Sequence, residues 1–178
     1  MSRGDSMPSI KILFTTPRKW DIGSCLIRKI TKQPYSHVLL LYGNKIYESG
    51  SKRGVSVRDL EEFIPDNIVT HTLKINVTEC QLTKILATAK AHKGKKYGHI
   101  NLFGALIYLK TNGRIKIFHD GRKTFHCSEF IGEILDCILP DLGKDLDFLK
   151  PEDIKKALEE GLVITNFVDW GKIGADIK

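Results

Sequence analysis

A cysteine, a histidine and a glutamate in this sequence have the types and settings that nucleophilic catalysis by a thiol requires. Cys127 opens a segment whose apolar residues recur at helical spacing, which predicts a helix with the thiol in its first turn. The partial positive charge and unpaired amides of a helix N-terminus favour thiolate over thiol. Because the thiolate is the nucleophile, we expect covalent chemistry here. A lone cysteine beside an apolar stripe is more often a small core residue, and that alternative stays open.

A thiol nucleophile needs a base, and the base needs a partner that fixes its tautomer. His37 opens an apolar run, and the Gly-Asn pair at 43–44 predicts a tight hairpin turn after it. A two-residue loop sets a register in which Glu48, on the returning strand, shares the face of His37 and lies diagonal to it. A three-residue loop would turn Glu48 to the other face. Either residue alone would more often be structural, but their shared face favours Cys127, His37 and Glu48 as a catalytic triad.

Neighbouring groups complete the expected site. The backbone amide of Ser128, together with that of Cys127, is placed to stabilise an oxyanion at the helix start. His126 is not the expected base, because adjacent residues on a helix do not face each other. The spacing of Cys127, Cys137 and His126 does not match a zinc site, and we expect neither a metal nor another cofactor.

Composition and length favour one globular α+β domain. The 178 residues are 42% hydrophobic and 28% charged, which suits a sizeable core and argues against disorder. The four cysteines form no CxxC pair, which argues against a zinc ribbon or a thioredoxin-like motif. No signal-peptide pattern and no apolar run of about 20 residues is present. We expect synthesis in the cytoplasm, with release by lysis, as phage products are released, left open. The predicted domain covers 9–170, with tails at 1–8 and 171–178.

The elements expected to position the site follow from periodicity and from turn residues. The segment 55–63 reads as a loop ending in a short helical turn, and 94–98 and 141–150 read as loops. Cys25, Cys80 and Cys137 fall on predicted apolar helix faces and are expected in the core. Strands are predicted over 10–15, 37–42, 45–49, 67–75, 114–118 and 162–168, and helices over 21–31, 78–91, 101–109, 127–140 and 151–160.

A net charge of +7 favours an anionic partner without requiring one. The densest basic segment contains Lys90, Lys93, Lys95 and Lys96, and reads either as a solvated helix end or as a contact to an anionic surface such as lipid head groups or a cell-wall polymer. No specific nucleic-acid contact and no transmembrane segment is expected. The apolar helix at 101–109 is too short to span a bilayer and reads as core or as an interfacial helix.

Four stretches together resemble the circularly permuted NlpC/P60 papain-like hydrolases, in particular the YiiX-like branch, which is also similar to the lecithin:retinol acyltransferase-like proteins. In that family the histidine strand precedes the cysteine helix, and the likeness runs over about 10–168. One departure is Pro8-Ser9, where family members often have Gly-Asp. The stretches are Pro34-Tyr35-Ser36-His37-Val38, Tyr47-Glu48-Ser49, His126-Cys127-Ser128-Glu129-Phe130 and Leu149-Lys150-Pro151-Glu152-Asp153-Ile154.

The resemblance implies a papain-like fold with a central antiparallel sheet packed against the cysteine-bearing helix. The resemblance implies that Cys127 is the nucleophile, that His37 is the base and that Glu48 is the third polar residue. It also implies that Tyr35 lines the substrate site. It implies a cysteine peptidase or amidase acting on a peptide or peptidoglycan-type amide through an acyl-enzyme. Two alternatives remain: a lipid-directed acyltransferase or thioesterase with the same triad, and a non-catalytic basic binding module of this fold.

Overall fold

The computed structural model describes residues 7–111, 114–115, 123–139 and 149–161. The strand predicted over 162–168, most of that over 114–118 and the loop over 141–148 lie outside the described residues. So do the tails, apart from residues 7 and 8.

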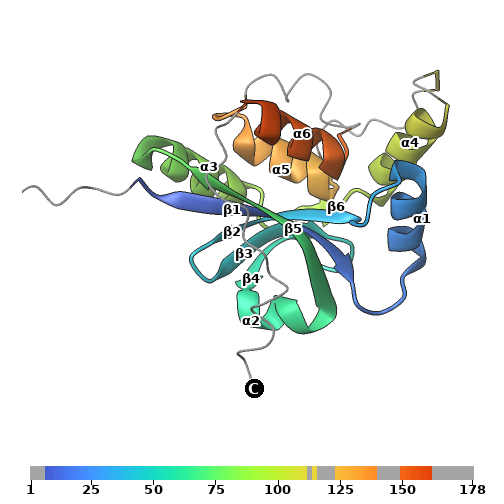
Figure 1. The fold of residues 1–178 in the computed structure, drawn as a ribbon, viewed down its shortest axis with the longest axis horizontal. Coiled ribbons are helices and arrows are strands. Elements are labelled where there is room, and N and C mark those ends of the chain that lie inside the picture. The colour runs from blue at the N-terminus through green and yellow to red at the C-terminus, as the bar shows by residue number, and fades with distance from the viewer. Residues whose placement is uncertain (1–6, 112–113, 116–122, 140–148, 162–178) are drawn as a thin grey trace, which may run out of the picture.

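The described chain is a mixed α+β structure built on one five-stranded antiparallel sheet, which confirms the predicted class (Figure 1). The strand order is β4-β3-β2-β1-β5, so the strand that begins with His37 is central. The strands are β1 (Ser9–Pro17), β2 (His37–Tyr42), β3 (Lys45–Gly50), β4 (Gly54–Asp59) and β5 (Asn67–Asn76).

The hairpin between β2 and β3 has the register that the two-residue turn predicts. Leu40 pairs with Tyr47 and Tyr42 pairs with Lys45. Gly43 in the turn has a φ of 57°, a conformation that favours glycine. Because the side-chain period of a strand is two residues, this register places Glu48 on the face of His37.

Helices cover both faces and one end of the sheet (Figure 1). The helices α3, α5 and α6 lie on one face, the short α2 (Leu60–Phe63) lies on the other, and α1 and α4 lie beyond one end of the sheet. A 3-10 turn, η1 (Ile64–Asp66), follows α2. The larger helices are α1 (Ile22–Thr31), α3 (Glu79–Ala91), α4 (His99–Lys110), α5 (Cys127–Leu135) and α6 (Pro151–Gly161).

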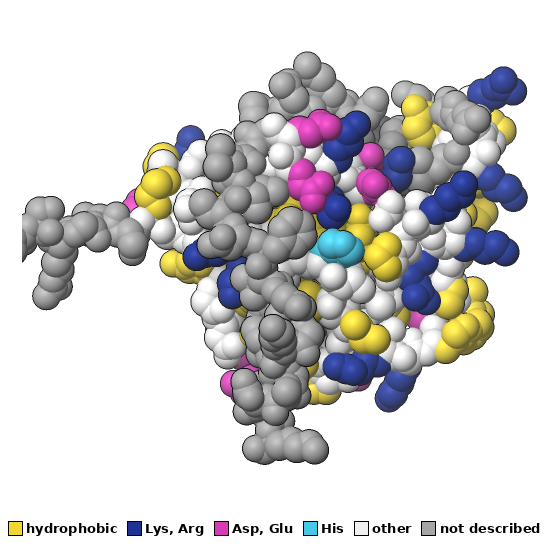
Figure 2. Space-filling model, viewed as in Figure 1, with side chains coloured by type: hydrophobic (Ala, Val, Ile, Leu, Met, Phe, Trp, Pro, Cys, Tyr) yellow, Lys and Arg dark blue, Asp and Glu magenta, His cyan; other side chains and the backbone are white. Residues whose placement is uncertain are grey.

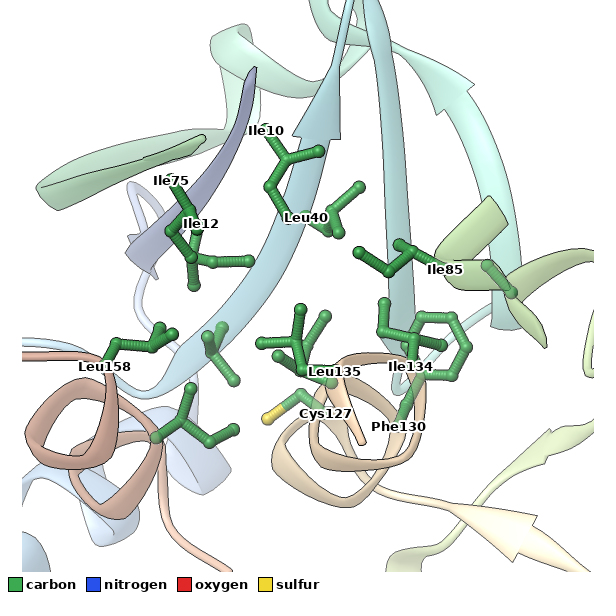
Figure 3. Packing of buried hydrophobic residues seen from close by; sticks show 14 of the residues in the cluster. Ile10, Ile12, Leu40, Ile75, Ile85, Cys127, Phe130, Ile134, Leu135 and Leu158 are labelled. Atoms are coloured by element: carbon green, nitrogen blue, oxygen red, sulfur yellow. The ribbon is translucent and has the colours of Figure 1, made fainter. Parts of the chain in front are cut away.

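The helix that carries the cysteine is the most deeply buried of these. Phe130, Ile131, Ile134 and Leu135 are all at most 1% exposed and pack toward β2, β3, α3 and α6. Figure 3 shows this cluster filling the space between the helices and the sheet. Each fully buried side chain of this size contributes about 1.5–3 kcal/mol, so α5 is fixed in place against the central strands.

The structure corrects three expectations. The segment expected as a loop at 55–63 begins as strand β4, whose residues are mostly half-buried at the sheet edge and give a weak apolar alternation. The loop expected at 94–98 contains β6 (Lys96–Tyr97), which pairs in parallel with β7 (Thr124–Phe125). The cysteine helix ends at Leu135, because the chain tightens into i to i+3 bonds such as Asp136 N–H to Glu133 O.

Candidate active site

His37 and Glu48 form a largely buried ion pair at one end of the central strands of the sheet. His37 Nε2 lies 2.8 Å from Glu48 Oε2. Glu48 is 3% exposed, and the His37 side chain is 18% exposed. The pair arises from the diagonal placement that the hairpin register predicts, since the first residue of β2 and the fourth of β3 share one face.

Arg58 holds the other oxygen of the same carboxylate. Its Nε lies 2.7 Å from Glu48 Oε1, and its guanidinium carbon lies 4.6 Å from the centre of the Phe63 ring. Arg58 pairs with Ile46 in the register of β3 and β4, so it is diagonal to Glu48. The sequence alone does not reveal this residue, because residues 55–58 read as a loop and the hairpin of β2 and β3 says nothing about a third strand. The alternation of residues 55–58 is the signal that would have found it.

The two cations keep Glu48 ionised despite its burial. Burial raises the pKa of this carboxyl, but the hydrogen bond and charge of His37 and the charge of Arg58 outweigh it, so the pKa is lowered from its ordinary value. Glu48 is therefore an anion and an acceptor for the imidazole N–H.

Cys127 is the first residue of α5, and His126 caps that helix. The Glu129 backbone N–H donates to His126 Nδ1 at 3.3 Å, and the His126 backbone N–H donates to Glu129 Oε2 at 3.3 Å, which makes a reciprocal capping box. Cys127 is 2% exposed. The nucleophile expected from the sequence thus stands at the start of a helix that is both capped and buried.

Both histidines act on the Cys127 thiol. Burial raises its pKa, but hydrogen bonds from His126 and His37, together with the charge of His37, bring the pKa well below 9.0. The expectation that His126 does not face the thiol is wrong. His126 precedes the helix in an extended conformation, with φ −84° and ψ 170°, so the rule for adjacent helical residues does not apply to it.

His37 is the cation of the pair. Burial lowers the pKa of its imidazole, but hydrogen bonds and charges from Cys127 and then Glu48 raise it to about 10. Because Nε2 is bonded to Glu48, Nδ1 is the nitrogen left to face the thiol. The residues of the predicted triad are therefore together, with a thiolate and an imidazolium as the favoured charge state.

The two other predicted site residues lie in different surroundings. Ser128 is 1% exposed, and its Oγ is 3.9 Å from Cys127 Sγ. Its amide belongs to the first turn of the helix, where N–H groups have no acceptor within the helix. Tyr35 is 1% exposed and lies in the core, with its ring 5.1 Å from that of Phe14 and 5.5 Å from that of His71. Those are the contacts of a core residue, and a substrate-lining role for Tyr35 stays a prediction.

Tyr97 is a neighbour of the site that the sequence did not reveal. It pairs with Phe125, two residues before the cysteine, in the parallel ladder of β6 and β7. Burial raises the pKa of its phenol well above 10.0, and the charges on Cys127 and then Asp21 add to this. Tyr97 therefore lies within electrostatic range of both the nucleophile and the start of α1.

The strand before the nucleophile is held from two sides. Ser49 Oγ donates to the Phe125 carbonyl at 2.6 Å, and the Gly98 N–H donates to the same oxygen at 3.0 Å. Ser49 follows Glu48 directly, so β3 supplies both the acid of the site and an anchor for β7. This anchor fixes the start of α5 relative to the His37–Glu48 pair.

The remaining expectations concern surfaces and cysteines. Lys95 Nζ lies 4.7 Å from the centre of the Phe125 ring, and the anionic contact predicted for the 90–96 segment stays a prediction. Cys25 and Cys137 are half-buried, whereas Cys80 is exposed, so its predicted core position is wrong. None of the helices described here has the length and apolar character needed to cross a bilayer.

Comparison of the chain with models of protein families and with curated proteins gives no match.

Proposed function

We propose that this protein is a cysteine-dependent hydrolase that cleaves an amide bond through Cys127, His37 and Glu48. The observation that carries the proposal is the buried His37–Glu48 pair, 2.8 Å apart, beside a helix-start cysteine whose pKa is lowered. Burying an ion pair costs free energy through desolvation. A fold that needed only a basic binding surface would gain nothing from placing that pair next to a thiolate.

The mechanism uses each group in a named role. The Cys127 thiolate attacks the carbonyl carbon, and the amides of Cys127 and Ser128 donate to the oxyanion. His37 then gives its proton to the leaving nitrogen as the C–N bond breaks, leaving a thioester on Cys127. Water attacks the thioester, with His37 accepting its proton, and release of the acid restores the thiolate. Glu48 holds the imidazole in the required tautomer and supports its charge.

A papain-like, circularly permuted arrangement is the fold we propose for this chemistry. It is supported by chain order, since the strand with the base precedes the helix with the nucleophile, and by the antiparallel sheet beneath that helix. A peptide or peptidoglycan-type amide is the proposed substrate class, by analogy with the family that the sequence resembles.

The direct test is the pH dependence of iodoacetamide alkylation at Cys127, followed by mass spectrometry of the cysteine peptides. An unperturbed thiol titrates near about pH 8.5, so we expect Cys127 to react well below that pH. Removing the imidazolium in His37→Ala should move the profile to higher pH. The exposed Cys80 in the same sample serves as the internal reference. An identical profile for Cys127 in both proteins would contradict the proposed ion pair.

The substrate is tested separately with purified sacculi. The wild-type protein should release muropeptides, and Cys127→Ala should reduce the rate by on the order of 10⁴-fold or more, as loss of a covalent nucleophile does. If a protein with a reactive Cys127 releases no muropeptides, the proposed peptidoglycan substrate is wrong, whereas the proposed triad is not contradicted.

A further inference from the structure

Large apolar side chains face solvent over α1 and α4, at the end of the sheet. Trp20 is 77% exposed, Ile22 68%, Leu26 43% and Phe103 55%. The helices α1 and α4 contact each other, so these side chains lie on, or just before, neighbouring elements. Figure 2 shows hydrophobic and basic side chains side by side at this end of the molecule. We call it the α1–α4 face.

A groove with an apolar and basic lining opens on the same face. Its volume is about 490 Å³. Lys150 forms an ion pair with Asp153 at 3.8 Å. Lys29 and Lys110 form no ion pair with any carboxylate in the described part of the chain. The acid on α1 is Asp21, which caps the opposite end of that helix. The groove is lined by Leu26, Lys29, Ile30, Thr31, Lys110 and Lys150.

We propose that the α1–α4 face docks on an anionic lipid membrane. Trp20, Ile22 and Phe103 would enter the boundary between head groups and acyl chains, where aromatic side chains are favoured. Lys29 and Lys110 would pair with lipid phosphates, as basic residues do at anionic membranes. The helix α4 is too short to cross a bilayer, which fits a protein that lies on the surface.

The positive charge of the α1–α4 face favours an anionic membrane over a second copy of the chain as its binding partner. A symmetric dimer through the α1–α4 face would bring the lysines of one copy against those of the other, in a chain whose net charge is +7. An anionic surface satisfies both the apolar and the basic side chains. The start of α1 lies within electrostatic range of the residues near the proposed site, since the charges on both Cys127 and Asp21, the N-cap of α1, raise the pKa of Tyr97.

Co-sedimentation of the full chain with vesicles tests the proposal. We compare phosphatidylcholine vesicles with vesicles of equal parts phosphatidylcholine and phosphatidylglycerol. The wild type should bind the anionic vesicles, more weakly as salt is added. Trp20→Ser with Ile22→Ser, and Lys29→Glu with Lys110→Glu, should each weaken binding at least about tenfold. Matched controls lie outside both this face and the 90–96 segment: Ile68→Ser, and Lys74→Glu with Lys84→Glu on β5 and α3, should bind as the wild type does.

Several outcomes would overturn the proposal. These are no preference for anionic vesicles, equal losses in the control variants, or a solution dimer that Trp20→Ser with Ile22→Ser dissociates. The pH profile of Cys127 alkylation is measured on every variant and should be unchanged, which shows that the fold is intact. Because that profile tests the hydrolase independently, a failure of docking and a failure of the proposed function are distinguishable.

Discussion

Glu48 lies between two cations, and each takes one of its oxygens. His37 occupies Oε2 and Arg58 occupies Oε1. The carboxylate therefore cannot rotate without breaking a charged contact, and the imidazole it supports is held in one orientation. Arg58 touches no reacting atom, so we assign it as a positioning residue that acts through Glu48.

Replacing Arg58 with methionine should move the acidic limb of the pH–activity profile upward by about one pH unit. The physical reason is that a neighbouring cation lowers a carboxyl pKa by about 1–3 units, and its loss lets Glu48 take up a proton at higher pH. Arg58→Lys should restore much of the wild-type profile. The profile of kcat/KM, or of Cys127 alkylation, provides the measurement.

The matched control is Lys45→Met on the adjoining strand. Lys45 pairs with Asp59 at 2.8 Å, but both side chains are largely exposed and neither touches Glu48. Its loss should leave the acidic limb where it is. If the acidic limb of the pH–activity profile is also unchanged in Arg58→Met, Arg58 does not position Glu48.

For individual residues, the sequence predicts the contact between two strands of one hairpin. It does not predict contacts that depend on a further strand or on the geometry of a helix cap. The two-residue turn was enough to place Glu48 beside His37. Arg58 depends on the pairing of β4, an edge strand whose half-buried residues carry a weak pattern. His126 was excluded by a rule for residues inside a helix, whereas it is a cap that precedes the helix.

Among the elements, the close approach of the β3–β4 turn to the segment before β6 depends on a glycine. Gly54 has a φ of 64°, and a Cβ added there would lie 2.2 Å from the Lys95 carbonyl oxygen. The Val55 N–H donates to that same oxygen at 2.8 Å, and the Gly94 N–H donates to Val55 O at 2.9 Å. This junction holds β4 against the chain that leads to Tyr97.

Gly54→Ala should destabilise the protein more than Gly43→Ala. Both positions have positive φ, which costs an L-residue about 1–2 kcal/mol. Gly43 has open space around it, whereas Gly54 would also have to displace a backbone carbonyl. Urea unfolding of the two variants compares these costs directly. Equal losses of unfolding free energy in the two variants would show that the backbone at Lys95 can move aside at little cost.

The strands with strong turn or apolar signals, and the helices with capping residues, were predicted with small shifts at their ends. Asp21 and Thr78, residue types that are favoured at helix N-caps, cap α1 and α3. The ladder of β6 and β7 was not predictable from local pattern, because each strand has two residues and their pairing joins distant segments.

For the molecule as a whole, the thiolate–imidazolium pair makes stability depend on pH. The folded pKa of His37, about 10, lies above its ordinary 6.5, so its contribution is fully present below pH 6.5 and is lost as pH rises through about 10. The folded pKa of Cys127 lies below 9.0, so its contribution is present above pH 9.0 and is lost as pH falls through the lowered value. Together the pair stabilises the fold most between about pH 6.5 and 9.0.

Urea unfolding of the wild type and Cys127→Ser across this range tests the dependence. The wild type should show a plateau of unfolding free energy between about pH 6.5 and 9.0 that falls on either side, and Cys127→Ser should lose that plateau. Cys80→Ser, at an exposed thiol, should keep the wild-type curve. Parallel curves for the wild type and Cys127→Ser would mean that the thiol is neutral in the folded protein.

The strand order also has a consequence for the order of events during synthesis. All five strands of the main sheet lie within residues 9–76, so His37, Glu48 and Arg58 leave the ribosome well before Cys127. Since domains are made from the N-terminus onward, the sheet with its base and acid can form first. The thiolate is stabilised only when α5 docks and the Ser49–Phe125 bond closes across 76 residues of chain. The Cys127 thiol of a nascent chain is therefore expected to stay unactivated until α5 has packed against the sheet.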